Sequence, residues 1–289
     1  MWPCTKGCSC LHRRGHAVVA ELRLKRRISA APSLSATVLG AVLLCVAMLT
    51  HADSAKPIER YTRVPAGADG IGKRYMGRDI AGVMGWQGAA WLEREERERE
   101  ERTDLLVTAL QLKPGMVVAD IGAGTGYLAR RMAPAVTPGG KVLAVDVQPE
   151  MLAMLRSTVR QTGLTQIQPL LGAEDDVRLP ASSVDLAIMV DVYHELAFPY
   201  EVLASIVRAL KPGGQLVFVE YRAEDPNVPI KALHKMSEAQ IKREAAAHSL
   251  VWERTVGVLP WQHLVVFSKR VNRAASMTFP KHSTPGEGV

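Results

Sequence analysis

The sequence predicts an α/β domain with a mostly parallel sheet, and two neighbouring strand-and-turn segments indicate it. Residues 117–121 are apolar and β-branched except for Asp120, which is typical of a strand covered on both faces. A glycine then stands at every second position before a helix that begins near Tyr127, so the backbone can turn sharply and lie against a ligand. A second apolar run, residues 142–145, follows this helix. The three glycines are Gly122, Gly124 and Gly126.

Turn-forming and capping residues mark the other elements along the chain. Pro149 begins a helix, Gly163 follows its end, and Ser237 caps a later helix. A charged helix from Glu93 precedes the first strand, and its Glu and Arg residues are typical of a solvated face. Pro260 lies in the turn of a closing antiparallel hairpin. The predicted strands are 117–121, 142–145, 167–171, 184–190, 216–221, 252–258 and 263–268.

An acid and the glycine spacing together indicate the kind of cofactor. Asp146 ends the second strand of a Rossmann-like unit, where an acid is placed to bind the hydroxyls of a ribose. Dinucleotide-binding proteins carry G-x-G-x-x-G, whereas this chain has G-x-G-x-G preceded by Asp120. An acid at that position would repel a pyrophosphate but suits a cofactor that carries an ammonium and a sulfonium.

This stretch resembles motif I of the class I S-adenosylmethionine-dependent methyltransferases, and three further segments match that family in order. They are Asp146, residues 179–189, and residues 209–214 before a strand. The resemblance covers about Leu105 to Lys269 and is looser towards the ubiquinone/menaquinone-biosynthesis methyltransferases. It implies a Rossmann-like seven-stranded, mostly parallel sheet with helices on both faces and a C-terminal antiparallel hairpin. It also implies S-adenosyl-L-methionine as the cofactor and a small-molecule methyl acceptor.

The resemblance assigns roles to residues of the cofactor site. The glycines Gly122, Gly124 and Gly126 would admit the amino-acid arm, Asp120 would hold the ammonium, and Asp146 would hold the ribose. Asp191, after the strand 184–190, is placed with these cofactor-binding residues.

The acid that recognises adenine in the family lies four residues before a Leu-Pro pair. Counting back from Leu179 indicates Asp175, with Asp176 supplying the next backbone N–H. Counting forward from Gly172 indicates Glu174 instead. A surface acidic turn is the structural alternative, so the three acids stay open at this point.

Polar side chains follow the strand 184–190, at the end of the sheet where open α/β folds bind ligands. His194 would serve as a base, because an ordinary histidine pKa of about 6.5 suits proton transfer near neutrality. The alternative is a histidine that caps the next helix or fills the pocket wall. Glu195 either orients His194 or is an acid at a helix start. The residues expected to face the acceptor, as catalytic or lining groups, are Tyr193, His194, Glu220 and Tyr221.

The histidines and acids of the domain show no metal-binding pattern. His194, Glu195, Glu220, His234 and His263 share no diagnostic spacing such as H-E-x-x-H, so the sequence predicts no metal.

The net charge of +7 belongs almost wholly to the N-terminal 52 residues. Seven Lys and Arg against one Glu give that segment +6, which leaves +1 for residues 53–289. A nearly neutral body gives no electrostatic reason to expect nucleic-acid binding. All four cysteines also precede residue 53, so the body has no disulfide, thiolate metal site or cysteine nucleophile.

Residues 1–52 are predicted to be a signal peptide or leader. An apolar core of about a dozen residues, 38–49, is too short for a comfortable membrane span and suits a signal peptide cleaved after Ala52. Export to the periplasm or the outside is therefore expected, with membrane contact only through an uncleaved leader. A mitochondrial transit peptide, or a cytoplasmic protein with a misassigned start, is the alternative. Residues 53–88 are expected to be a linker and a lid, residues 89–269 the methyltransferase domain, and residues 270–289 a disordered tail.

Three functions stay open on the sequence alone. Methyl transfer from S-adenosyl-L-methionine is the first. A non-catalytic cofactor-binding or scaffold protein is the second. A nicotinamide-dependent oxidoreductase is the third, and the glycine spacing disfavours it.

Overall fold

A computed structural model describes residues 59–271 of the chain. The predicted leader and all but the first two residues of the predicted tail lie outside this range. Within it, no helix is both long enough and apolar enough to cross a membrane.

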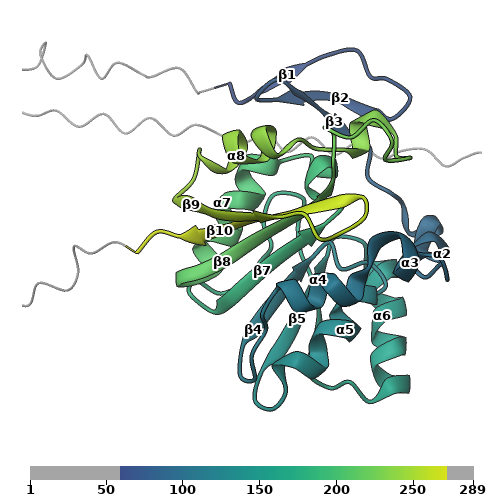
Figure 1. Cartoon of the computed structure of the whole chain (residues 1–289), viewed down its shortest axis with the longest axis vertical. Helices are drawn as coiled ribbons and strands as arrows, with labels where there is room; N and C mark the ends of the chain where they lie inside the picture. The colour runs from purple at the N-terminus through teal and green to yellow at the C-terminus, as the bar shows by residue number, and fades with distance from the viewer. Residues whose placement is uncertain (1–58, 272–289) are drawn as a thin grey trace, which may run out of the picture. The chain divides into compact units, whose positions relative to one another are not determined.

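A seven-stranded sheet forms the centre of the described part, in the order β6-β5-β4-β7-β8-β10-β9 (Figure 1). The pairs among β6, β5, β4, β7 and β8 are parallel, and β10 is antiparallel to both β8 and β9. The predicted mostly parallel sheet with a C-terminal antiparallel hairpin is confirmed. The strands are β4 Val117–Ile121, β5 Lys141–Asp146, β6 Ile167–Leu171, β7 Val184–Val190, β8 Leu210–Tyr221, β9 Leu250–Val256 and β10 Gln262–Lys269.

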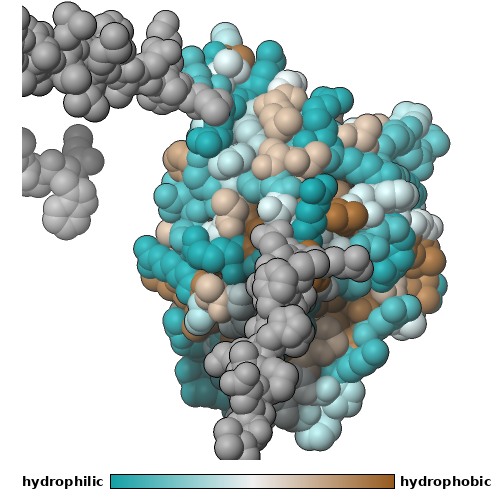
Figure 2. Space-filling model, turned by 90° about the vertical axis from the view of Figure 1, so that its left-hand side faces the viewer, coloured by the Kyte–Doolittle hydropathy of each residue, from teal (hydrophilic) through white to brown (hydrophobic). Residues whose placement is uncertain are grey.

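Helices cover both faces of this sheet, because successive residues of its central strands are apolar on both sides (Figure 1). Ala119 of β4 belongs to a core shared with α7 and α8, whereas Val118 belongs to a core shared with α4, α5 and α6. The helices are α4 Thr103–Ala109, α5 Tyr127–Val136, α6 Pro149–Thr162, α7 Pro199–Ala209 and α8 Glu238–Ala245. On the face drawn in Figure 2, hydrophilic residues cover most of the surface and apolar ones lie in separate patches.

The capping signals place the helices as predicted. Pro149 is the first residue of α6, and Gly163 ends that helix in the left-handed conformation with φ of 68°. The Ser237 side chain accepts a hydrogen bond from the Gln240 N–H at the start of α8. The predicted elements therefore begin and end close to these residues.

The predicted linker is wrong for residues 61–72, because this segment contributes to a second, three-stranded antiparallel sheet. Its strands are β1 Tyr61–Arg63, β2 Gly70–Tyr75 and β3 Arg78–Ala81. Tyr61 packs on Tyr75 and Phe198 with ring centroids 5.4 and 6.2 Å away, and Arg78 pairs with the buried Glu244 of α8. The contacts with Phe198 and Glu244 join residues more than a hundred positions apart, so no local period in the sequence reveals them.

The charged segment from Glu93 is also not one solvated helix. It divides into short helices, because Arg102 adopts the left-handed conformation with φ of 49° between α3 Arg97–Glu101 and α4. Arg97 and Glu101 are buried rather than solvated. The segment before them contains η1 Trp86–Gly88 and α2 Ala89–Leu92. Trp86 is 43 % exposed and does not belong to the core.

Candidate active site

A cavity of about 640 Å³ lies at the carboxyl ends of β4, β5 and β7. Its position is the point where the strand order reverses, since β5 and β7 lie on opposite sides of β4. Open α/β sheets bind ligands at this point. The predicted residues that line the cavity are Asp120, Gly122, Gly124, Asp146, Glu174, Asp191, His194 and Tyr221.

The glycine turn and the acid of the next strand are joined directly. One oxygen of Asp146 accepts a hydrogen bond from the Gly124 N–H at 2.8 Å, and the other accepts one from the Gln148 N–H at 2.8 Å. Asp146 is only 6 % exposed, and burial raises the pKa of its carboxyl above the ordinary value. The carboxylate is therefore fixed by the backbone at the cavity wall, where a ribose hydroxyl can donate to it.

A Cβ atom would meet different neighbours at each of the three glycines of the turn. Gly122 has φ of 72°, and a Cβ there would come within 2.5 Å of Val192. A Cβ at Gly124 would meet Leu92 at 2.6 Å, and both glycines line the cavity. Gly126 does not line it: a Cβ there would lie 2.2 Å from the Leu155 side chain of α6. This close contact gives Gly126 a packing reason to be glycine, and its role at the cofactor stays a prediction.

Asp120 presents an unpartnered carboxylate oxygen to the cavity. The residue is buried, and among the described residues its Oδ2 has no hydrogen-bond partner. Burial raises the pKa of Asp120 to about 7, and the nearby Asp146 adds to this while Arg97 opposes it. A buried carboxyl with a free oxygen suits a ligand that brings a cation, such as the ammonium of S-adenosyl-L-methionine.

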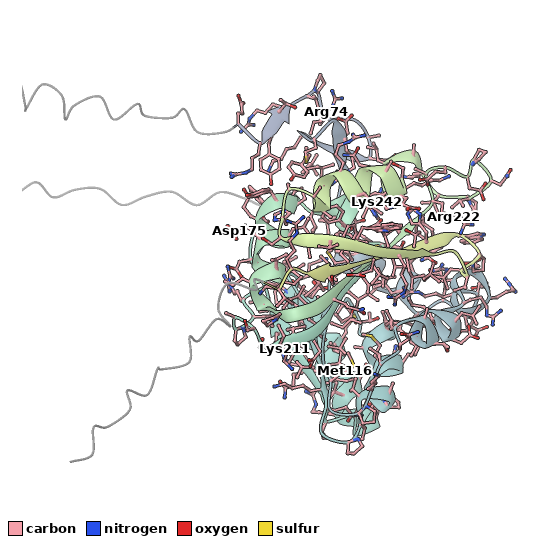
Figure 3. All side chains as sticks on the ribbon, turned by 60° about the vertical axis from the view of Figure 1, so that its left-hand side comes forward. Arg74, Met116, Asp175, Lys211, Arg222 and Lys242 are labelled. Carbon is pink, nitrogen blue, oxygen red and sulfur yellow. The ribbon has the colours of Figure 1, made fainter. Side chains whose placement is uncertain are left out.

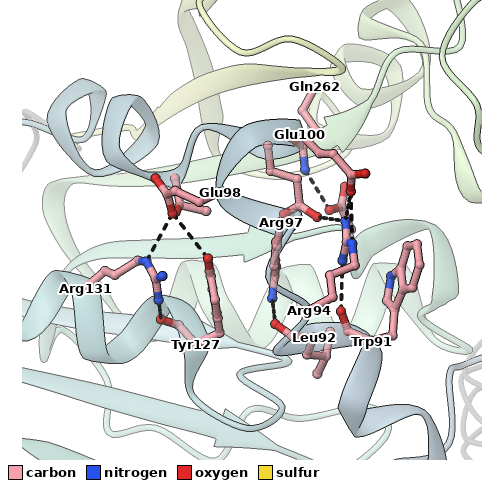
Figure 4. A network of polar contacts seen from close by, with 12 residues as sticks. Trp91, Leu92, Arg94, Arg97, Glu98, Glu100, Tyr127, Arg131 and Gln262 are labelled. Atoms are coloured by element: carbon pink, nitrogen blue, oxygen red, sulfur yellow. Dashed lines mark hydrogen bonds and ion pairs between the residues drawn. The ribbon is translucent and has the colours of Figure 1, made fainter.

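A buried Arg–Glu network forms another part of the cavity wall, and the sequence did not indicate it (Figure 4). Arg97 Nε and Glu101 Oε2 lie 2.8 Å apart, and Arg97 also donates to the Leu92 carbonyl at 2.9 Å. Arg94 pairs with Glu101 at 2.8 Å, and Tyr221 donates to the same carboxylate. The i,i+4 spacing of Arg97 and Glu101 was visible in the sequence, but the burial of that face was not.

Asp191 lies next to this network. It is held in the left-handed region with φ of 53°, and its Oδ2 accepts a hydrogen bond from Gln262 at 2.8 Å. Burial raises the pKa of Asp191 well above the ordinary value, and the carboxylates of Glu101 and Glu220 raise it further. Asp191 therefore belongs to the cavity wall, and its contact with the cofactor stays a prediction.

Among the three acids of the adenine loop, the structure favours Glu174. Glu174 lines the cavity. Asp175 is exposed at the outer edge of the domain (Figure 3), and Asp176 pairs with Arg208 at 2.8 Å. Asp175 and Asp176, the residues indicated by counting back from Leu179, do not line the cavity.

His194 also lines the cavity, and a buried acid holds its ring. Its Nδ1 is 2.6 Å from Glu220 Oε2, and its Nε2 is 3.1 Å from His234 Nδ1. Burial alone lowers the pKa of His194, but Glu220 and Glu195 outweigh it and raise the pKa to about 10. This pKa does not match the ordinary value on which the prediction of a base near neutrality rested.

Two predicted acceptor residues do not reach the cavity. Tyr193 is fully buried, and its hydroxyl donates to Glu244 at 2.7 Å. Glu220 is fully buried as well and accepts from the Tyr193 N–H at 2.8 Å and from His194. Tyr193 therefore fills the core, and Glu220 positions His194. His263 is buried in β10 and does not line the cavity either.

Comparisons with known proteins agree with this geometry. A family model described as a methyltransferase domain matches residues 119–218. An uncharacterized methyltransferase of Mycobacterium tuberculosis is 38% identical over 102 residues, which are 35% of this chain and 38% of that protein. A ubiquinone/menaquinone biosynthesis C-methyltransferase of Bordetella parapertussis is 33% identical over 119 residues, 41% of this chain and 46% of that one.

The fold of the described part is similar to that of a solved methyltransferase structure. A SAM dependent methyltransferase from Aquifex aeolicus superposes with a TM-score of 0.61 at 25% identity, covering 65% of this chain and all of that one. The chain spans about a third to a half of the length of the curated relatives that it matches. These comparisons identify a methyltransferase domain at residues 119–218 and support a class I S-adenosylmethionine-dependent methyltransferase.

Proposed function

We propose that the protein binds S-adenosyl-L-methionine and transfers its sulfonium methyl group to a small-molecule acceptor. One observation carries this proposal: a single cavity is lined by Asp120, the glycine turn and Asp146, which we call its cofactor end, and by His194, which we call its acceptor end. A sulfonium nucleoside bound along the first three would direct its methyl group towards the histidine. Methyl transfer needs mainly in-line alignment in a dry pocket, which a buried cavity supplies.

The cofactor end has a residue suited to each part of S-adenosyl-L-methionine. Asp146 would accept from the ribose hydroxyls, Asp120 would neutralise the ammonium, and Glu174 would approach the adenine. Gly122 and Gly124 leave room for the amino-acid arm. When bound, the cofactor supplies the electrophilic methyl, and the residues of this chain orient it and exclude water.

The size and lining of the whole cavity suit a small-molecule ligand that has an apolar part. The cavity volume of about 640 Å³ lies within the range of ordinary small-molecule sites, roughly 300 to 1,000 Å³. Val83, Trp91 and Val147 line the cavity and are exposed, so part of its rim is apolar. The Bordetella relative is named for C-methylation in ubiquinone and menaquinone biosynthesis, which makes hydroxylated aromatic compounds the first acceptors to try.

The full-length chain tests this proposal when it is incubated with methyl-labelled S-adenosyl-L-methionine and a cell extract. We expect label in the small-molecule fraction, and less of it with the Asp146→Ala variant. Binding of the cofactor without transfer to any fraction would favour the non-catalytic scaffold. Binding of NADH in place of S-adenosyl-L-methionine would favour the oxidoreductase.

A further inference from the structure

Three side chains at the acceptor end bring their ligand atoms together around one point. His234 Nδ1 lies 3.1 Å from His194 Nε2 and 3.4 Å from Glu195 Oε1. His194 Nε2 and Glu195 Oε1 are 3.7 Å apart. All three residues line the cavity. His234 is forty positions away in the sequence from its partner histidine, so sequence spacing could not indicate this cluster.

These separations match those of ligands around one metal ion. Bonds of about 2.0 to 2.1 Å at tetrahedral angles place two zinc ligands about 3.3 Å apart. The three observed separations, 3.1, 3.4 and 3.7 Å, are distributed about that value. An ion could therefore be bound with shifts of a few tenths of an ångström.

The surroundings orient the ligand atoms as metal sites require. Glu220 accepts from His194 Nδ1 at 2.6 Å, so a bound ion would displace the Nε2 proton and take the Nε2 lone pair at the cluster. Carboxylates that hold the second nitrogen of a ligating histidine are the usual outer partners of zinc. The Met84 N–H donates to Glu195 Oε2 at 3.3 Å and leaves Oε1 for the cluster. Glu195 and Glu220 also place two negative charges beside the position of the ion.

We propose that His194 Nε2, His234 Nδ1 and Glu195 Oε1 bind a divalent transition-metal ion, with zinc as the first candidate. Two imidazoles and one carboxylate form the ligand set of open catalytic zinc sites and of non-haem iron(II) sites. The remaining coordination position faces the cavity. If the protein is the methyltransferase proposed above, an acceptor oxygen would bind there, and the ion would lower the pKa of its hydroxyl.

The alternative is a hydrogen-bonded imidazole pair with no ion. A proton on His194 Nε2 would then be donated to His234 Nδ1 across the same 3.1 Å. A metal titration distinguishes the metal site from the imidazole pair. The pair alone would show no metal affinity that depends on His234 or Glu195.

The test is a titration of the full chain, purified without a polyhistidine tag and stripped with a chelator. The four cysteines Cys4, Cys8, Cys10 and Cys45 are replaced by serine, so that thiolates cannot bind the probe. Co²⁺ is added while the visible spectrum is recorded, and Zn²⁺ is titrated in competition with a chromophoric chelator. Mg²⁺ serves as the hard-cation comparison. We expect one Zn²⁺ per chain and a Co²⁺ spectrum of low coordination number.

Matched variants assign the ligands. His234→Ala and Glu195→Ala should each weaken Zn²⁺ binding by more than about 100-fold, and the outer Glu220→Gln by about 10- to 100-fold. His248→Ala, a half-buried histidine that does not line the cavity, should bind as the parent does. Thermal unfolding checks that each variant folds. If only one of His234→Ala and Glu195→Ala keeps its fold, the Zn²⁺ affinity of that variant decides whether the residue is a ligand. Equal Zn²⁺ affinity in the parent and that variant, or preference for Mg²⁺, would overturn the proposal.

Calorimetry with S-adenosyl-L-methionine on the stripped protein separates this inference from the proposed function. If the protein binds S-adenosyl-L-methionine but no Zn²⁺, the metal site is refuted and the proposed function is not. Zn²⁺ binding that depends on His234 in a protein that binds no cofactor would remove the proposed function alone.

Discussion

The two ends of the cavity are built in different ways. At the cofactor end, backbone N–H groups bind one carboxylate, as Gly124 and Gln148 bind Asp146. At the acceptor end, side chains bind side chains, as Glu220 binds His194 and His194 contacts His234. The first end depends on backbone shape and on the absence of Cβ atoms, and the second on the identity of titratable groups. Substitutions should therefore separate cofactor affinity from turnover.

The largest effect is expected at the acceptor end. His194→Ala should lower kcat by about 100-fold or more, the usual contribution of a positioned acid–base or ligand group, and leave the affinity for S-adenosyl-L-methionine unchanged. Steady-state kinetics and calorimetry measure the two quantities, with His248→Ala as the control. An unchanged kcat, or an equal loss of affinity and rate, would show that the two ends do not act separately.

A glycine that packs helices should affect stability rather than binding. Gly126→Ala should lower the free energy of unfolding by about 3 kcal/mol, because its Cβ would overlap Leu155 and its φ is 81°. Gly163→Ala is the matched control: φ is 68°, but no atom lies within 4 Å of its Cβ, so about 1 kcal/mol is expected. Urea denaturation measures both. Equal losses would mean that backbone strain alone accounts for Gly126.

The ribose assignment predicts a moderate loss of affinity. Asp146→Ala should weaken S-adenosyl-L-methionine binding by about 1–3 kcal/mol, the range for hydrogen bonds to a charged group. Asp175→Ala, exposed and outside the cavity, should bind as the parent does. Unchanged calorimetric affinity in the Asp146 variant would discard the assignment.

The smallest effect is a pH dependence from Asp120. Its pKa of about 7 in the free protein means that the carboxylate, which the ammonium needs, is lost as the pH falls through 7. Arg97 and Asp146 are the charged groups that face it. Affinity should fall by up to about tenfold between pH 7.5 and 6, while an α-amino group of pKa near 8 stays protonated. Calorimetry across this range should show no such fall in Asp120→Asn, and a fall of equal size would contradict the ammonium assignment.

Sequence reasoning brought the glycine turn and Asp146 together correctly because the segment that contains them is local. The strand at 117–121, the glycine turn and Asp146 lie within thirty positions, and each carries a signal of composition or capping. The parallel sheet followed from the same pattern, and Pro149 and Gly163 delimit α6 as expected.

The acceptor end could not be predicted in the same way, because tertiary packing decides it. Arg97 and Glu101 show a helical spacing that is typical of a solvated face, yet they are buried against Tyr221. Tyr193 follows the strand at a position that would face a ligand, but its ring packs edge-on to Phe218 at 4.9 Å in the core. His234 reaches the cavity from an irregular segment with no periodic signal.

A crystal structure of the full chain with S-adenosyl-L-methionine tests the central claim most directly. The account predicts the ribose hydroxyls within hydrogen-bond distance of Asp146, the ammonium beside Asp120, and the methyl group directed towards His194. A ligand bound in another cleft, or no ligand in this cavity at saturating cofactor, would contradict it.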